Sequence, residues 1–274
     1  MTGVNKPVSI DSIEPSGAGF RTDRSLRHET FATVVVVIAL IAAMEIASRY
    51  VPDYIMPSPL KVLEAARKLF FQDYTHVFIT ILRLIAAVAF SMLLGIVFGV
   101  AMGMLPAVRS YLRALVIIDT GVPALSWMLI AIFWFKDPET RIFFILVVIL
   151  LPFYALNVYE GIRALPKDLL DMIESFRPTR WQVMRYLIGP HIVQYIFLTT
   201  KSVIGYAIRM TIFAELIASA IGVCSRMGLA HASFHIDQLL AWTFFLIALS
   251  LSLQAAINVV EKHFMHWRPE LEIR

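Results

Sequence analysis

Six long runs of apolar residues, each bounded by polar or charged segments, dominate the pattern of this chain. They cover residues 31–48, 78–104, 115–135, 141–159, 192–221 and 239–260. Each run is long enough to cross the hydrocarbon core of a bilayer, which takes about 20 residues of helix. A helix also satisfies its own backbone hydrogen bonds in lipid. The pattern therefore predicts an all-α, polytopic membrane bundle of six transmembrane helices.

The composition agrees with this prediction and excludes other classes of protein. Of the 274 residues, 59% are hydrophobic and 16% are charged, whereas soluble domains are about 45–50% apolar and about 25% charged. A soluble globular enzyme and a disordered chain are both excluded. The one cysteine, Cys224, leaves no disulfide framework within the chain and no cysteine-rich metal site.

The basic residues predict how the helices are oriented. With the N-terminus inside, 14 of the 24 Lys and Arg residues lie in inner segments and 7 in outer segments. Cytoplasmic loops of membrane proteins carry this excess, so both termini are expected in the cytoplasm. The net charge of +4 then reflects basic loops, and no nucleic-acid partner is expected. We expect a flexible cytoplasmic tail at 1–30, a transmembrane domain at 31–260 and a cytoplasmic C-terminal tail at 261–274.

Two further patterns concern packing. Residues 60–71 follow Pro59 and alternate apolar and charged faces, which predicts a short amphipathic helix lying on the outer surface. Gly95, Gly99 and Gly103 share one face of the second span, where another helix can approach closely. The spacing leaves open whether this face contacts a second subunit or packs inside the bundle.

The inner segment 160–190 is charged but has the pattern of two short helices. Leu169, Ile173 and Phe176 recur on one face after Pro166, and Pro178 interrupts the run. Thr179 then begins a capping box with Gln182, and the second helix is expected to end near Pro190. The resulting helix pair carries an apolar ridge that ends in Phe176 and Trp181. Such a ridge either folds back onto its own bundle or docks in a groove of a soluble partner.

Several charged residues fall within or at the edges of the spans, where charge is expensive and usually faces a bundle interior or water. Lys201, Gly205 and Arg209 lie at i, i+4 and i+8, on one face of the fifth span. This face is either a basic path for an anionic solute or a place of structural ion pairing. The candidates for such pairing are Glu45, Asp119 and Glu215.

We expect neither a metal centre nor a catalytic site. His231 and His235 have the i, i+4 spacing of a zinc helix, but Ala232 stands where a metalloprotease would carry its general base. The sequence has no nucleophile elbow. It also contains no Gly-Lys dipeptide, and therefore no phosphate-binding P-loop, so any ATP hydrolysis would occur in a partner chain.

Motifs spread over residues 52–267 resemble the permease subunits of bacterial ABC importers, within them the nitrate/sulfonate/taurine type. The matching pieces are Met56-Pro57-Ser58-Pro59, Val122-Pro123-Ala124, Leu151-Pro152-Phe153, Arg180-Trp181-Gln182, Ala214-Glu215-Leu216 and Gly228-Leu229. The sequence departs from the family's coupling motif in two places. This sequence has Asp171-Met172-Ile173 where the family motif has Glu-Ala-Ala, and it has Arg177 where the motif has a glycine.

The resemblance implies a type I ABC importer-like fold in the bacterial inner membrane, with 160–190 as the coupling-helix loop. It implies three partners besides lipid: ABC ATPase subunits, a second permease copy, identical or unlike, and an extracytoplasmic solute-binding protein. No cofactor is expected in this chain, and ATP-Mg would be bound by the ATPase. The residues expected to couple to the ATPase are Asp171, Ile173, Phe176, Arg177, Arg180 and Trp181. Those expected along the translocation pathway are Lys201, Gly205, Arg209 and Glu215.

The resemblance to this subfamily favours a small anion, such as a sulfonate, nitrate or an organic acid, as the solute. Two alternatives stay open from the residues alone. One is a channel or scaffold that acts without ATP, although it gives no reason for a capped, apolar helix pair in an inner loop. The other is a membrane enzyme, for which no reactive constellation is visible.

Overall fold

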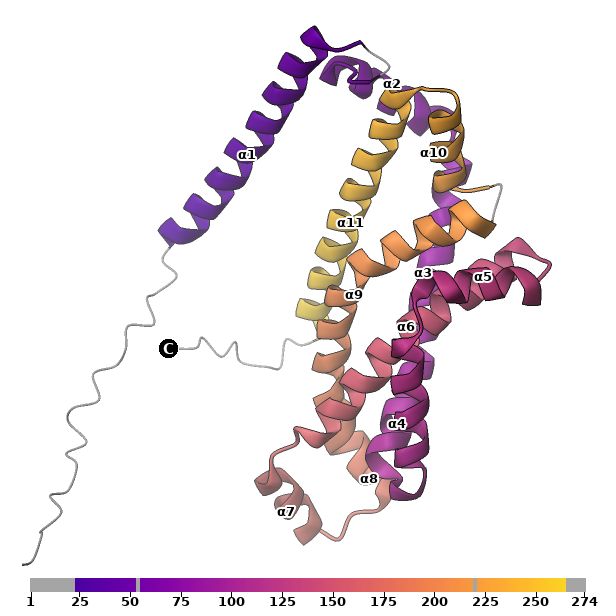
Figure 1. The fold of residues 1–274 in the computed structure, drawn as a ribbon. Helices are drawn as coiled ribbons and strands as arrows, with labels where there is room; N and C mark the ends of the chain where they lie inside the picture. The colour runs from indigo at the N-terminus through magenta and orange to yellow at the C-terminus, as the bar shows by residue number, and fades with distance from the viewer. Residues whose placement is uncertain (1–22, 53–54, 219–220, 265–274) are drawn as a thin grey trace, which may run out of the picture.

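The computed structural model describes residues 23–52, 55–218 and 221–264, and the regular structure in these ranges is entirely helical (Figure 1). The helices before the predicted inner loop are α1 Asp23–Tyr50, α2 Pro59–Gln72, α3 Tyr74–Met104, α4 Pro106–Gly121, α5 Ala124–Trp134 and α6 Pro138–Arg163. The loop itself contains α7 Lys167–Ser175 and α8 Arg180–Val183. A π-helical segment, Met184–Ile188, then leads into α9 Gly189–Ala218, α10 Val223–Ala232 and α11 Ile236–Phe264.

The long helices run up and down between two ends of the bundle. In Figure 1, α2 and α10 lie at one end and α7 and α8 at the other, with α3, α6, α9 and α11 running between them. α1 stands apart from these helices and joins them through α2 (Figure 1). Its exposed Val36, Ile38 and Leu40 suit contact with lipid tails.

The described residues do not confirm all six predicted spans. Within the described residues, four helical stretches are long and apolar enough to cross a membrane: α3, α6, the stretch Arg180–Ala218, and α11. The pair α4 and α5 makes a fifth if it counts as one bent span. α1 covers the predicted run 31–48 with a helix but is not among these five.

The run predicted as one span at 115–135 is not a continuous helix, because the chain bends by 98° between α4 and α5. Proline disfavours helical backbone in the residue before it, and Val122, which precedes Pro123, is extended, with φ −82° and ψ 123°. The amphipathic helix predicted at 60–71 is confirmed as α2. α1 begins inside the predicted tail 1–30, and α11 ends inside 261–274. The remainder of both tails lies outside the described residues.

The glycine face of α3 packs inside the subunit, against α6. A Cβ atom added to Gly99 would lie 2.6 Å from Cβ of Val158, and one added to Gly103 would lie 2.6 Å from Cδ1 of Ile162. An added Cβ at Gly95 would collide with Tyr154. Small residues allow two helix backbones to approach closely where lipid offers no hydrophobic drive for association. This settles the question that the spacing left open, in favour of internal packing.

Candidate functional site

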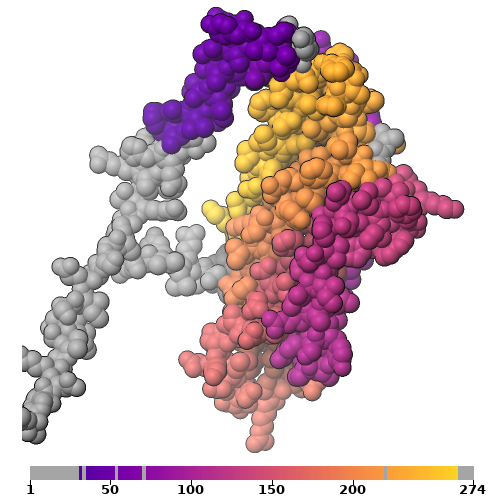
Figure 2. Space-filling view, viewed as in Figure 1, coloured from indigo at the N-terminus to yellow at the C-terminus, as the bar shows by residue number. Residues whose placement is uncertain are grey.

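The predicted helix pair of the inner segment is present and projects from the end of the bundle. α7 follows Pro166 and has Asp168 in its first turn, and α8 begins at Arg180. Figure 2 shows this part of the chain as the lower tip of the molecule. Phe176 is 79% exposed and Trp181 is 69% exposed, so the ridge does not fold back onto its own bundle.

The turn between α7 and α8, which we call the elbow (residues 176–179), is held by local hydrogen bonds. The backbone N–H of Thr179 donates to Oε1 of Gln182 at 2.7 Å, and the N–H of Gln182 donates to Oγ1 of Thr179 at 3.3 Å. This is the predicted capping box. Arg177, before Pro178, has a φ of +50°, which residues other than glycine seldom adopt.

The six predicted coupling residues lie together on α7, the elbow and α8. Asp171, Arg177 and Arg180 are exposed like the two aromatic residues, while Ile173 is half-buried. The second helix does not end near Pro190, as predicted, but continues through the π-helical segment into α9. The backbone N–H of Gly189 donates to the carbonyl of Met184, five residues back, and this wider turn accommodates Pro190.

The predicted basic face of α9 carries two cationic side chains, of which one forms an ion pair and the other does not within the described residues. Lys201 forms an ion pair with Glu261 of α11, which was not among its predicted partners. Arg209 is exposed, and its Nε donates to the carbonyl of Gly205 at 3.2 Å. No carboxylate in the described part of the chain forms an ion pair with Arg209. The fixed positive charge of this face therefore belongs to Arg209.

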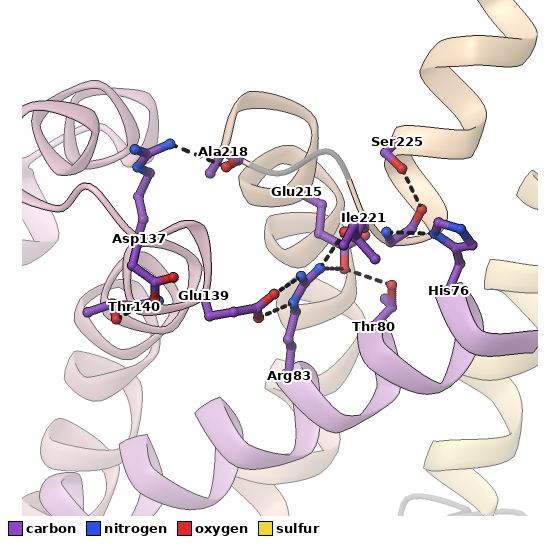
Figure 3. Close-up of polar contacts among 12 residues, drawn as sticks. His76, Thr80, Arg83, Asp137, Glu139, Thr140, Glu215, Ala218, Ile221 and Ser225 are labelled. Carbon is purple, nitrogen blue, oxygen red and sulfur yellow. Dashed lines mark hydrogen bonds and ion pairs between the residues drawn. The ribbon is translucent and has the colours of Figure 1, made fainter.

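Glu215 lies elsewhere, fully buried in a polar cluster shown in Figure 3. Its Oε1 accepts from Nη1 of Arg83 at 2.8 Å and from Oγ1 of Thr80 at 2.7 Å, and its Oε2 accepts from the backbone N–H of Cys224 at 3.2 Å. Six residues separate Glu215 from Arg209, which puts them on different faces of α9. The structure therefore does not bring Glu215 together with Lys201 and Arg209, and its place in a pathway stays a prediction.

Arg83 is the centre of this cluster, which we call the Glu215 network (His76, Thr80, Arg83, Glu139 and Glu215). Its Nε donates to Glu139 Oε2 at 2.6 Å, its Nη2 pairs with the other oxygen of Glu139, and its Nη1 also donates to the carbonyl of Ile221 at 2.7 Å. These contacts tie α3 to α6, to α9 and to the turn before α10. A buried guanidinium with this many acceptors is compensated for the loss of water.

The turn before α10 is held by the same network. Nδ1 of His76 accepts from the backbone N–H of Gly222 at 3.0 Å, and Oγ1 of Thr80 accepts from that of Val223 at 3.0 Å. Gly222 has a φ of +136°, and a Cβ there would lie 2.5 Å from the carboxylate of Glu215. Only glycine fits this turn. Burial, together with the charge of Glu215, raises the pKa of the adjacent Cys224 thiol to about 12.

Arg83 lies within the predicted span 78–104, but sequence reasoning missed its partners. Glu139 follows the proline that starts α6 and reads as an ordinary acidic residue in a first helical turn. His76 and Thr80 share a face of α3 with Arg83 at spacings of four and three, which is the signal that was available. His231 and His235, which the sequence paired, are both exposed at the α10 end of the bundle.

Comparison with known proteins places the chain in a family. Residues 91–266 match the family model described as "Binding-protein-dependent transport system inner membrane component". The chain is 24% identical over 251 residues to the taurine transport system permease protein TauC of Escherichia coli (strain K12), covering 89% of this chain and 90% of that one. It is 26% identical over 140 residues to the nitrate import permease protein NrtB of Leptolyngbya laminosa, covering 51% and 48%.

A solved structure has the same fold. An inward-facing conformation of the MetNI methionine ABC transporter matches with a TM-score of 0.62 and 14% sequence identity, over 72% of this chain and 97% of that one. This likeness shows the fold of a type I importer permease, while the family model, which spans well over half of the chain, shows the family. The chain thus belongs to the binding-protein-dependent transport system inner membrane components, the permease subunits of ABC importers, and among its relatives are a taurine permease and a nitrate permease.

Proposed function

We propose that this permease forms the solute pathway of an ATP-driven importer and is coupled to a separate ATPase subunit through α7, the elbow and α8. The observation that carries the proposal is the exposure of Phe176 and Trp181 on a pair of helices whose turn is capped. Large apolar side chains held outside the bundle on ordered backbone are typical of a helix that docks in a partner's groove.

The aromatic pair supplies most of the expected binding energy. Burying one such side chain in a partner contributes about 1.5–3 kcal/mol, so losing one weakens docking by one to two orders of magnitude. Asp171 is exposed and its ionic contacts are expected to contribute less than about 1 kcal/mol. The aromatic residues would then hold the ATPase, and the charges around them would orient it.

The solute is proposed to be small and to carry an acid group. Two relatives are named for taurine and for nitrate, which share a compact oxyanion. Arg209 supports the same class of solute, because its exposed guanidinium has no carboxylate partner among the described residues. A solute-binding protein would deliver the solute from outside. A second permease copy, identical or unlike, would complete the pathway.

The test compares Phe176→Ala and Trp181→Ala with Asp171→Asn in the permease purified together with its ATPase. Each aromatic variant should release the ATPase in detergent, or leave its hydrolysis uncoupled from ATP-driven uptake in liposomes, while Asp171→Asn should do neither. The bundle should stay folded in all three, because the three side chains are exposed at the end of the bundle. Tyr74→Ala is a matched control, since Tyr74 is 68% exposed at the opposite end.

Full retention of the ATPase with normal uptake in both aromatic variants would show that the elbow is not the coupling element. Release in Tyr74→Ala as well would show a general loss of stability instead of a lost docking contact.

A further inference from the structure

A small cavity lies at the break between α4 and α5, and it has no part in the coupling proposed above. Non-helical backbone at membrane depth is tolerated where it is buried in protein or lines a cavity. Here the extended residues between the two helices border a cavity of about 90 Å³. The walls come from α4, α5, α6 and α9, and the side chains that carry the argument are Asp119, Trp127, Phe153 and Tyr206.

Two polar atoms in this cavity lack the hydrogen bonds that their burial calls for. Oδ1 of Asp119 and Nε1 of Trp127 are both shielded from solvent, and among the described residues neither meets the distance and angle of an ordinary hydrogen bond. The indole N–H of Trp127 still lies near enough to the Asp119 carboxylate to interact with it. Buried polar atoms are nearly always paired, and an acidic residue inside a membrane bundle usually marks a path for a solute or an ion.

The cavity has a negative group and a concentration of aromatic side chains. Three of its lining residues are aromatic, and the rings of Phe153 and Tyr206 lie 5.4 Å apart, tilted by 56°. A site made of a carboxylate and aromatic rings binds organic ammonium groups, because the carboxylate attracts their charge and the rings add cation–π attraction. Among the described residues, no Lys or Arg lines the cavity to neutralise Asp119 from within.

We propose that the cavity at the α4–α5 break is a subsite for a positively charged nitrogen of the transported solute, held by Asp119 and the rings of Trp127, Phe153 and Tyr206. This assignment rests on the proposed function and narrows it. Arg209 follows Tyr206 by three residues on α9, on a neighbouring part of the same helix surface. With Arg209 for the acid group and Asp119 for the nitrogen, the solute is a small zwitterion, not a simple anion.

The test observes the indole of Trp127 directly, in the full chain labelled with fluorotryptophan and placed in lipid nanodiscs. The chain has five tryptophans, and Trp127→Phe assigns the resonance. Methylammonium is the probe, and sodium ethanesulfonate is its partner without nitrogen. The resonance of Trp242, which is 2% exposed and outside the cavity, serves as an internal reference.

Methylammonium should shift the Trp127 resonance and leave that of Trp242 unchanged, and ethanesulfonate should shift neither. Asp119→Asn should weaken the response about ten- to a hundredfold, as expected for a lost charge-assisted contact. Asp119→Glu should keep most of it, which separates a lost charge from a misfolded cavity. Three results would overturn the proposal: no response to methylammonium, an equal response in Asp119→Asn, or an equal response to ethanesulfonate.

A cavity that holds only an ordered water between Asp119 and Trp127 would give no response to methylammonium. The measurement needs neither ATP nor the ATPase, so its failure leaves coupling through the elbow untouched. Conversely, normal ATPase retention together with normal uptake in Phe176→Ala and Trp181→Ala would overturn that coupling without changing the response of Trp127.

Discussion

At the scale of single residues, the charges of this permease are sorted by whether they have partners. Arg83 and Glu215 form a pair between α3 and α9, and Lys201 pairs with Glu261. Arg209 keeps its charge exposed. A charge in such a pair is neutralised within the protein and stabilises the fold. A charge without a partner can bind a charged solute.

The different roles of Arg209 and Lys201 can be measured. Arg209→Gln should lower uptake of an anionic or zwitterionic solute such as taurine by raising KM, while the ATPase stays bound. Lys201→Gln should act through stability instead. It removes one partner of a half-exposed ion pair worth at most about 1 kcal/mol, and Lys201→Gln combined with Glu261→Gln should recover part of that loss. Equal uptake by Arg209→Gln and the unchanged protein would remove Arg209 from the pathway.

Cys224 should be inert towards thiol reagents in the folded protein. Only the thiolate form of cysteine reacts. A rise in the pKa of the Cys224 thiol from 9.0 to about 12 lowers the thiolate population about a thousandfold at any pH below both pKa values. N-ethylmaleimide at about pH 8 should therefore modify Cys224 only after denaturation. Mass spectrometry of the intact chain reads the modification, and rapid labelling of the native permease would contradict the burial.

The same shift predicts how stability depends on pH. The folded pKa of Cys224 is raised above the unfolded value, so the unfolded chain loses its proton first as the pH increases. The contribution of this thiol to the free energy of unfolding is complete below about pH 9 and is lost progressively as the pH approaches 12. Cys224→Ser should flatten the alkaline side of the unfolding profile.

At the scale of elements, local signals in the sequence predicted the helices well and their continuity less well. The capping box of Thr179 and Gln182 was predicted and is present, because it needs only neighbours along the chain. Pro123 and Pro190 were misjudged in opposite directions. The helix breaks at Pro123 and continues past Pro190, since the π-helical turn before Pro190 relieves the clash and no such turn precedes Pro123.

Long-range partners could not be predicted from the pattern. Arg83 and Glu215 are 132 residues apart, and nothing local distinguishes Glu215 from the other acidic residues near a span. The glycine face of α3 was visible in the sequence, but its partner was not. The candidate cavity depends on both kinds of information, since Asp119 and Trp127 line one cavity only because the chain bends within the run predicted as one span.

The packing of α3 on α6 gives a prediction at this scale. Gly99→Leu should destabilise the fold by about 3 kcal/mol or more, since even its Cβ would lie 2.6 Å from Val158. Gly121→Leu is the matched control, because an added Cβ at Gly121 meets nothing within 4 Å. Unfolding in a denaturing detergent, followed by loss of helical circular dichroism, compares the two. Equal midpoints would show that the α3–α6 contact is looser than described.

At the scale of the whole molecule, the two ends of the bundle are expected on opposite sides of the membrane. Ser110 is near the start of α4, Ser233 directly follows α10, and both are exposed. In Figure 1, α4 extends towards the end that carries α7 and α8, and α10 lies at the other end. In a Cys224→Ser background, Ser233→Cys should react with an impermeant thiol reagent in intact cells. Ser110→Cys should react only after permeabilisation, because the basic loops predict a cytoplasmic location for it. The reverse pattern would invert the predicted orientation.

The helical stretch Arg180–Ala218 runs without a loop from the elbow to the Glu215 network. Its 39 residues correspond to about 58 Å of helix along the chain, with Trp181 near one end and Glu215 near the other. Under the coupling proposed above, a partner that displaces Trp181 would act on Glu215 through continuous helical backbone. The π-helical turn Met184–Ile188 is the one departure from α-helical hydrogen bonding in this stretch of the described residues. Arg83 binds both Glu215 and Glu139, so a movement that reaches Glu215 would be shared by α3, α6 and α9.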